Sequence, residues 1–181
     1  MANPDMANGF RPWADPYSGG GQPQITEHDL LATNAVVGIG SPVVVAAGGV
    51  DHATAGTGNA LLGIAAEAKA VNSGAGEKIK VWSDPQQLFV GQTDNGTGTA
   101  TALAAVGLNI NFIGVAVGAN NLSTSELDES SAAAGATIQF KIMRLAQEIN
   151  GKALNAFGEF NRFVVKINNH QKQGGTGTAG V

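Results

Sequence analysis

The sequence contains 181 residues, of which 43% are hydrophobic and only 13% are charged, and its formal net charge is −4. A chain of this length can bury one sizeable core, which predicts a single domain with tails. The acidic balance and the scattered basic residues argue against a polycationic surface, so we expect no direct binding to nucleic acid.

The sequence has no cysteine, which excludes disulfides and thiolate metal sites. Packing, or assembly with other subunits, must therefore stabilise the fold. No apolar run approaches the roughly 20 residues that a membrane helix needs, and the N-terminus lacks the basic-then-apolar order of a signal peptide. We expect a soluble protein with no membrane partner.

Residues 1–23 are predicted to form an extended N-terminal arm. The stretch holds four of the six prolines and a glycine run at 19–21, so neither a helix nor a central strand can pass through it. It also holds three of the ten aromatic residues, Phe10, Trp13 and Tyr17. Large rigid side chains in a segment that cannot form its own core favour anchoring in pockets of a partner.

Residues 24–171 are predicted to form one mainly β domain. The 26 glycines and the abundant Ala, Val, Thr and Asn are typical of short strands separated by turns. In chain order, we expect strands near 42–47, 49–54 and 60–70, a hairpin-like pair at 78–82 and 88–90 joined by Asp84-Pro85, a short helix at 98–106, and strands at 138–142 and 163–167. Residues 147–161 are expected to be a long connection.

The last two strands are predicted to share one interior. In each of them apolar and polar or long side chains alternate, as in a half-buried strand. The side chains expected to face this interior are Ile138, Phe140, Ile142, Phe163, Val165 and Ile167. Residues 172–181 offer almost nothing to bury and are expected to be a flexible Gly/Thr tail.

Charge is spread unevenly along the chain. Residues 1–60 carry one Arg against five acidic residues, whereas residues 136–181 carry six basic residues against two acidic ones. The six are Lys141, Arg144, Lys152, Arg162, Lys166 and Lys172. A basic face is one interpretation, and a solvated strand edge is the favoured one.

A search for catalytic or metal-binding patterns yields only weak candidates. His28, His52 and His170 lack any HxH or HxxxH spacing, which favours surface or capping roles. The glycines of GIGSPVVV precede no helix, so they do not predict a phosphate-binding loop. No GxSxG nucleophile motif occurs.

Two groups of carboxylates remain as candidates. Glu126, Asp128 and Glu129 in SELDESS could hold Ca²⁺, but the glycine and terminal Glu of an EF-hand loop are missing. A solvated loop is the favoured interpretation. Asp84 and Asp94 could act as a glycosidase pair, although nothing in the sequence sets their separation. We therefore expect no enzyme, no catalytic residue, no cofactor and no metal site.

Four blocks of the sequence resemble a known family when they are taken together and in order. They are MANPD…GFRPW, GSPVVVAAGG, LLGIAAEAKAV…KVWSDPQQLFVGQ and IQFKIMRLAQ…NAFGEFNRFVVKINNHQ. The set is similar to the capsid decoration, or cement, proteins of tailed bacteriophages. It spans most of residues 1–171, whereas the glycine run at 19–21 and the tail after Gln171 depart from the pattern.

This resemblance implies a compact β-barrel or β-tulip-like domain with at most one or two short helices and an extended arm. It implies a structural virion protein, made in the host cytoplasm, that binds the outer capsid surface and cements major capsid subunits against DNA pressure. Self-association as a trimer is favoured over a dimer. The residues expected to bind the capsid are Phe10, Arg11, Trp13 and Tyr17.

Two other classes of protein fit the sequence less well. A phage fibre, or a receptor- or glycan-binding virion module, would be equally rich in Gly, Thr and Asn, but it predicts regular repeats that this sequence lacks. A small β-barrel hydrolase would need a pocket with perturbed acids, and no such set can be named from the sequence.

Overall fold

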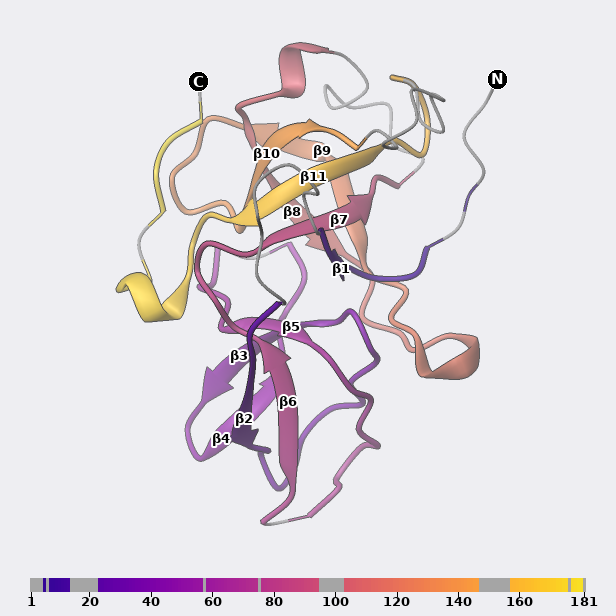
Figure 1. Ribbon diagram of the computed structural model, residues 1–181, viewed down its shortest axis with the longest axis vertical. Coiled ribbons are helices and arrows are strands. Elements are labelled where there is room, and N and C mark those ends of the chain that lie inside the picture. Colours follow the sequence, from indigo (N-terminus) through magenta and orange to yellow (C-terminus); the bar gives the residue numbers. More distant parts are fainter. Residues whose placement is uncertain are drawn as a thin grey trace.

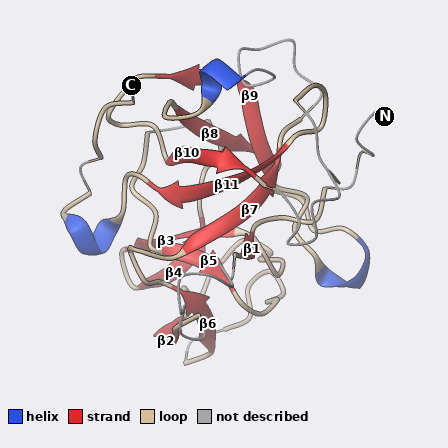
Figure 2. Ribbon diagram, turned by 45° about the horizontal axis from the view of Figure 1, so that its top comes forward, coloured by secondary structure: helices blue, strands red, loops and turns tan. Residues whose placement is uncertain are grey.

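The computed structural model describes residues 5, 7–13, 23–56, 58–74, 76–94, 103–146, 157–175 and 177–180. Strands dominate these ranges, and three short 3-10 turns are the helical elements within them (Figure 2). The strands are β1 (Arg11–Pro12), β2 (Ile25–Asp29), β3 (Pro42–Ala46), β4 (Gly49–His52), β5 (Gly63–Ala65), β6 (Lys78–Trp82), β7 (Leu88–Gln92), β8 (Asn109–Ile113), β9 (Glu126–Ala133), β10 (Phe140–Leu145) and β11 (Arg162–Ile167). The turns are η2 (Leu103–Ala105), η3 (Ala119–Asn121) and η4 (Gln171–Gln173).

The mainly β fold expected from the sequence is confirmed, and it is built from two antiparallel sheets. One has six strands in the order β1-β7-β11-β10-β8-β9, and the other has five in the order β2-β6-β5-β3-β4 (Figure 1). The arrangement resembles an open β-sandwich and is not a single closed barrel. Within the described ranges no helix has the length and apolarity to cross a membrane.

The strands β6 and β7 do not form the expected hairpin. β6 pairs with β2 and β5, whereas β7 pairs with β1 and β11, so the two strands belong to different sheets. The turn at Asp84-Pro85 forms, with the Gln87 amide donating to the Asp84 carbonyl at 3.0 Å. It redirects the chain from one sheet to the other, because a turn signal defines where a strand ends and not which strand it pairs with.

The main core lies on the inner face of the six-stranded sheet. Five of the six side chains expected to share an interior do so, namely Phe140, Ile142, Phe163, Val165 and Ile167. Ile138 is only half-buried and lies two residues before the first residue of β10. A second cluster of buried side chains belongs to the five-stranded sheet and the loops beside it. It consists of Leu30, Val37, Val43, Val50, Leu62, Ala65, Ile79 and Val81.

Other predicted elements are shorter than expected. The strand expected at 60–70 is reduced to the three residues of β5, and the helix expected at 98–106 is represented by the single turn η2. Residues 98–102 of that helix, and residues 147–156 of the predicted long connection, lie outside the described residues. The sequence patterns did not predict β2, β8 or β9.

The described part of the C-terminal tail packs on the domain, contrary to the expectation of a flexible tail. The buried Asn109 amide donates to the Thr178 carbonyl at 2.8 Å, and the Gly180 amide donates to the Ala134 carbonyl at 3.1 Å. At Gly177, a Cβ would lie 2.2 Å from the Ala136 carbonyl oxygen. Glycine is therefore needed there for the tail to approach the backbone so closely.

Candidate partner-binding face

Strand alternation places cationic side chains on the outer face of the six-stranded sheet. Phe163, Val165 and Ile167 of β11 enter the core, so Arg162 and Lys166 point to the opposite side. By the same alternation in β10, Lys141 points outward between Phe140 and Ile142. Lys141 lies directly opposite Lys166 in the pairing of β10 with β11.

Two further arginines join this face through strand register. Arg11 of β1 is paired with Val90 of β7, and Arg144 of β10 is paired with Val164 of β11. An irregularity between Ile142 and Arg144 shifts the register of β10, which is how a β-bulge re-aims side chains. Among the residues that the structure describes, the cationic side chains of the outer face are thus Arg11, Lys141, Arg144, Arg162 and Lys166.

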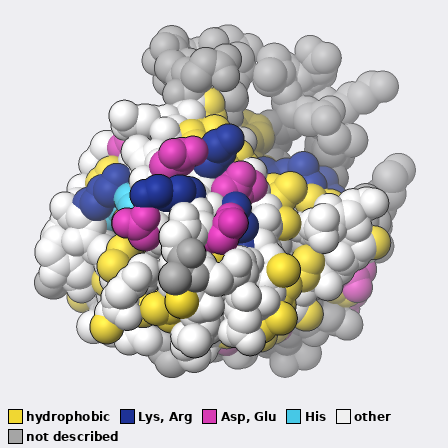
Figure 3. Space-filling model, turned by 90° about the horizontal axis from the view of Figure 1, so that it is seen from below, with side chains coloured by type: hydrophobic (Ala, Val, Ile, Leu, Met, Phe, Trp, Pro, Cys, Tyr) yellow, Lys and Arg dark blue, Asp and Glu magenta, His cyan; other side chains and the backbone are white. Residues whose placement is uncertain are grey.

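Charges are arranged differently on the five-stranded sheet. There Glu27 pairs across strands with Lys80, and Asp29 with Lys78, the latter as an ion pair. Seen from that end, acidic and basic side chains are intermixed (Figure 3). On the six-stranded sheet the outward cations gather on β1, β10 and β11, whereas at the β9 edge Glu126 and Asp128 flank the core residue Leu127 and point outward.

Phe10 is not the exposed anchor that was expected. It has no exposed area, and its ring stacks on Phe140 with centroids 4.6 Å apart and planes inclined by 13°. Its backbone amide donates to the Gly40 carbonyl at 2.9 Å. Gly91 makes room for this ring, since a Cβ there would lie 2.5 Å from it. The aromatic side chain completes the core of its own domain, which corrects the predicted role in partner binding.

The segment that follows Phe10 is an edge strand rather than a free arm. Arg11 is exposed, while Trp13 is half-buried and donates its backbone amide to the Leu88 carbonyl at 2.8 Å. The Arg144 guanidinium lies 5.6 Å from the centroid of the Trp13 ring, a cation–π geometry. Tyr17 lies outside the described residues. Arg11 and Trp13 thus border the outer face.

Two hollows open on the outer face. The first has a volume of about 200 Å³ and is lined by Asn8, Gly9, Arg11, Val90, Gln92 and Arg162. The second, of about 420 Å³, lies between Lys141, Lys166 and Met143 and reaches Thr178 of the tail. In it, the Lys166 ammonium donates to Gln86 Oε1 at 2.6 Å. Cationic side chains therefore line both hollows.

A cluster of carboxylates lies where β7 ends. The Glu129 amide donates to Asp94 Oδ1 at 3.0 Å, and the Asp94 amide donates to the Leu127 carbonyl at 3.0 Å. SELDESS is thus mostly strand β9, not the solvated loop expected, and its Glu126 and Glu129 share Asp94 as a neighbour. Among the described residues, no three His, Cys, Asp or Glu side chains are arranged to hold a metal ion.

Burial dominates the electrostatics of this cluster. Glu129 has no exposed area, and neither of its carboxylate oxygens has a hydrogen-bond partner within the described part of the chain. Burial, reinforced by the charges of Asp94 and Glu159, raises the pKa of Glu129 to about 7. Burial raises the pKa of Glu126 to about 7 as well, with Asp5 and Asp94 adding to the effect. The cluster therefore takes up protons near neutral pH.

The proposed Asp84–Asp94 pair is not brought together. Asp84 precedes β7 and Asp94 follows it, and the five residues of that strand alone span about 17 Å. Asp84 instead accepts a hydrogen bond from the Gln86 amide at 2.8 Å in the turn before β7. This separation is far greater than either arrangement of glycosidase carboxylates allows.

A chain of polar side chains connects the C-terminal turn to the five-stranded sheet. The Lys172 ammonium donates to Ser83 Oγ at 2.7 Å, and Thr26 Oγ1 lies 2.6 Å from Ser83 Oγ and 2.7 Å from His28 Nε2. Burial, and then the charge of Lys172, lower the pKa of His28. Ser83 is fully buried and lines none of the described hollows. These contacts hold η4 in place.

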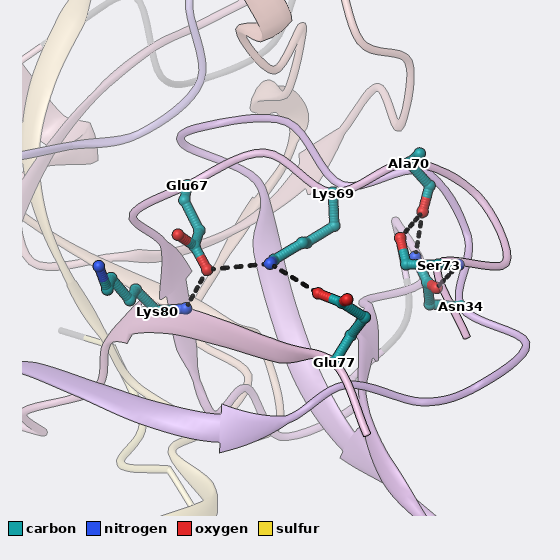
Figure 4. Close-up of polar contacts among 7 residues, drawn as sticks. All are labelled: Asn34, Glu67, Lys69, Ala70, Ser73, Glu77 and Lys80. Carbon is teal, nitrogen blue, oxygen red and sulfur yellow. Dashed lines mark hydrogen bonds and ion pairs between the residues drawn. The ribbon is translucent and has the colours of Figure 1, made fainter. Parts of the chain in front are cut away.

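A third hollow, of about 450 Å³, lies beside the loop that follows β5. Its lining is mostly apolar and includes Val36, Val71 and Val117. Lys69 at its rim is placed between Glu67 and Glu77, at 3.4 and 3.5 Å (Figure 4).

The buried Asn34 fixes the loop beside this hollow. Its side-chain amide donates to the Ala70 carbonyl at 2.7 Å, and its Oδ1 accepts from the Ser73 amide at 3.0 Å (Figure 4). Ser73 Oγ also donates to the Ala70 carbonyl at 2.7 Å. These hydrogen bonds fix the shape of the loop at residues 70–73.

Comparison with known protein families, characterised proteins and solved structures finds no match for this chain.

Proposed function

We propose that this chain is a structural protein of a tailed-phage particle, which binds the outer surface of the icosahedral capsid and cements neighbouring major capsid subunits. The resemblance of its sequence blocks to decoration proteins supports the proposal. The structural observation that carries it is the outer face, on which five cationic side chains gather in a chain whose net charge is −4.

The shape of the outer face fits a large partner better than a small molecule. Small-molecule sites enclose most of their ligand in a cleft of roughly 300–1,000 Å³. Here a sheet face carries one hollow of about 200 Å³, below that range, and a second of about 420 Å³, within it, which is lined mostly by polar residues instead of the apolar ones typical of small-molecule sites. Interfaces between proteins instead spread over about 800 Å² on each partner, with charges that complement one another. A capsid surface that carries acidic side chains would offer both the large contact area and the complementary charge.

Cementing needs no chemistry from the bound protein. A protein that binds only the assembled, expanded shell stabilises that state by mass action, because dissociation of the shell would also lose the bound subunits. Each bound copy that touches two capsid subunits adds contacts that oppose internal DNA pressure. Self-association, with a trimer favoured, multiplies these contacts through avidity.

The experiment uses expanded capsid shells that have been stripped of this protein. Purified full-length chain is added back at low ionic strength, and occupancy is measured after sedimentation. Replacing both lysines of the second hollow, Lys141→Gln with Lys166→Gln, should reduce occupancy at least tenfold. The matched control, Lys78→Gln with Lys80→Gln on β6, removes the same charge from the other sheet and should leave occupancy unchanged.

Mechanical function is tested on the same particles. Shells with bound protein should withstand heating or osmotic shock that opens bare shells. Saturated shells that open under the same conditions as bare shells would contradict the cementing role, and an absence of binding by the unmodified chain would contradict the whole proposal.

A further inference from the structure

The described end of the C-terminal tail, residues 177–180, is held by two asparagines. Asn168, which follows β11, accepts hydrogen bonds at its Oδ1 from the Thr178 amide at 3.0 Å and from the Thr178 hydroxyl at 3.2 Å. The fully buried Asn109 of β8 donates its side-chain amide to the Thr178 carbonyl at 2.8 Å. Both main-chain groups and the side chain of Thr178 are therefore bound, and we call Asn109 and Asn168 the asparagine clamp.

The domain fixes the asparagine clamp in place. The Asn168 side-chain amide donates to the Ala136 and Ile138 carbonyls, both at 3.0 Å. The Asn109 side-chain amide likewise donates to the Gly135 carbonyl at 2.9 Å. These three carbonyls belong to the connection between β9 and β10, beside which the C-terminal end lies (Figure 1). Side chains that are already ordered lose little entropy when they bind a ligand, so the clamp is a preformed site.

The other contacts of residues 177–180 also involve the backbone of the tail. The Gly180 amide donates to the Ala134 carbonyl at 3.1 Å, and the Ala179 carbonyl accepts from the Lys141 ammonium at 3.5 Å. None of the four residues belongs to either core cluster. Main-chain hydrogen bonds are the principal contacts when a protein binds an extended peptide at the edge of its fold. The tail is therefore held in the manner of a bound peptide.

The space around the tail selects its sequence. A Cβ at Gly177 would overlap the Ala136 carbonyl oxygen and the Asn168 side-chain amide, and a Cβ at Gly180 would lie 2.9 Å from Leu108 Cα. Both glycines are thus required by the closeness of the neighbouring atoms. Between them, Thr178 supplies the hydroxyl that the clamp binds. The clamp therefore favours the sequence Gly-Thr-Ala-Gly over segments with a larger residue at either glycine position.

A pair of glycines connects the tail to the turn η4. Gly174 and Gly175 have positive φ angles of 83° and 70°, in the left-handed region that glycine adopts without steric cost. The Gly175 amide donates to the His170 carbonyl at 3.1 Å, which ties this pair to η4. Glycine has the widest range of backbone conformations, so a tail that leaves its own clamp can be redirected at these two residues.

We propose that the asparagine clamp is a peptide-binding site for the sequence Gly-Thr-Ala-Gly, and that its partner is the C-terminal tail of a second copy of this chain. Every copy carries the same tail, so a neighbour's tail offers the clamp the same contacts. Exchange of an identical segment between protomers is a low-cost route to assembly. The inference supplies a contact for the self-association proposed above, and in that respect it rests on the proposed function.

A protomer's own tail competes with a neighbour's tail for the clamp. A short flexible linker gives the own tail an effective concentration in roughly the millimolar range, so we expect exchange only where copies are crowded together. Binding on a shell would provide such crowding. The contact is heterologous, because the tail of one copy meets the clamp of the next, and such contacts close into rings when the rotation allows it. Three tails in three clamps would form the favoured trimer.

The first test opens the clamp of the full-length chain with Gly177→Ala, which keeps its own tail from docking. The probe is the synthetic peptide GTGTAGV, and binding is followed by NMR through the side-chain amides of Asn109 and Asn168. The variant should bind this peptide at least tenfold more tightly than GTATAGV, which carries the same change from glycine to alanine. The unmodified chain should bind GTGTAGV at least tenfold more weakly than the variant does, because its own tail fills the clamp.

The matched control for this test is Gly118→Ala. Gly118 has a φ of −86°, and a Cβ there would make only an ordinary contact, at 3.4 Å from Thr124 Cγ2. This variant keeps its tail in the clamp and should bind GTGTAGV as weakly as the unmodified chain. Gly180→Ala, with GTGTAAV as its control peptide, repeats the test at the second glycine. Circular dichroism verifies that the variants are folded.

The second test asks whether the tail of one copy reaches the clamp of another. Asn168→Ala lacks the clamp but keeps the tail, whereas Gly177→Ala keeps the clamp but lacks a tail that fits. When the two full-length variants are mixed, sedimentation velocity should show a complex that neither forms alone. If Asn168→Ala does not fold, a carrier protein that ends in GTGTAGV takes its place as the tail donor.

Two results would overturn the inference. Equal affinity of the Gly177→Ala variant for GTGTAGV and GTATAGV, or no binding of GTGTAGV, would show that the clamp is not a peptide-binding site. A mixture that sediments as its two separate components would show that the tail does not pass between copies.

The failure of this inference is distinguishable from that of the proposed function. If the mixed variants form no complex but the unmodified chain occupies and protects shells, the exchange of tails falls and the cement function stands. If the complex forms but the unmodified chain never occupies shells, the exchange of tails stands and the cement function falls.

Discussion

Phe10 and Phe140 are 130 positions apart in the sequence, yet their rings stack at a centroid distance of 4.6 Å in the centre of the main core. This contact fastens the N-terminal segment to β10. It makes residues 7–13 part of the domain, although their composition predicted a separate arm. Arg11 and Trp13, which follow Phe10 in the chain, are thereby held at the edge of the outer face.

Replacement of Phe10 should be strongly destabilising. Phe10→Ala removes a fully buried ring and leaves a cavity against Phe140, so we expect a loss of about 3–5 kcal/mol in the free energy of unfolding. Trp13→Ala, which truncates a half-buried side chain, should cost less. Urea denaturation checks both variants. A loss below about 1 kcal/mol for Phe10→Ala would show that the segment does not belong to the core in solution.

Stability should depend on pH through Glu129. Burial raises its pKa from the ordinary 4.5 to about 7, so between these values the unfolded chain loses the proton while the folded chain keeps it. Stability therefore falls as pH rises through this window, and the full cost applies above pH 7. The Glu129→Gln variant has no carboxylate to ionise at this position. Its free energy of unfolding minus that of the unmodified protein should therefore be about 1–3 kcal/mol larger at pH 8 than at pH 4.

The matched control for this prediction is Thr93→Val. Its hydroxyl is also fully buried and has no hydrogen-bond partner among the described residues, but it does not ionise. Its effect on the free energy of unfolding should be the same at both pH values. A Glu129→Gln variant with an equally flat pH profile would mean that the carboxylate is solvated in the folded protein.

Asn34 should be more important for stability than the ion pairs beside it. Asn34→Ala leaves the Ser73 amide without its side-chain partner and the Ala70 carbonyl with Ser73 Oγ alone, so we expect a loss of about 1–3 kcal/mol. Hydrogen exchange of residues 70–73 should accelerate. Lys69→Ala, which breaks ion pairs with Glu67 and Glu77 at the surface, should cost less than about 1 kcal/mol. A larger loss of stability for Lys69→Ala than for Asn34→Ala would contradict the assignment of Asn34 as the residue that fixes the loop.

Truncation after residue 176 should destabilise the domain. It removes the Thr178 carbonyl that accepts from the buried Asn109, and the Thr178 amide that donates to Asn168. We expect a loss of about 1–2 kcal/mol. Thr178→Ala keeps both backbone contacts and serves as the control, with a smaller effect. Unchanged thermal unfolding of the truncated chain would restore the expectation of a dispensable tail.

The sequence by itself determined the fold class and the inner faces of β10 and β11. In these strands the alternation of apolar and polar side chains is regular, and a strand's period of two residues assigns each side chain to a face without knowledge of its partner. Phe140, Ile142, Phe163, Val165 and Ile167 were predicted in this way. The sequence of β9 does not show this alternation of apolar and polar residues. The next buried residue after Leu127 in this strand is the acidic Glu129, not an apolar residue.

Only the tertiary structure decided which strands pair and which charges gather. β6 and β7 are adjacent in sequence but join different sheets, since pairing is chosen by packing between distant segments and not by a local turn. The same holds for Phe10, whose place in the core depends on the space left by Gly91. Arg11 and Arg162 line one hollow over β7 only because β1 and β11 both pair with that strand, and local periodicity carries no information about such a register.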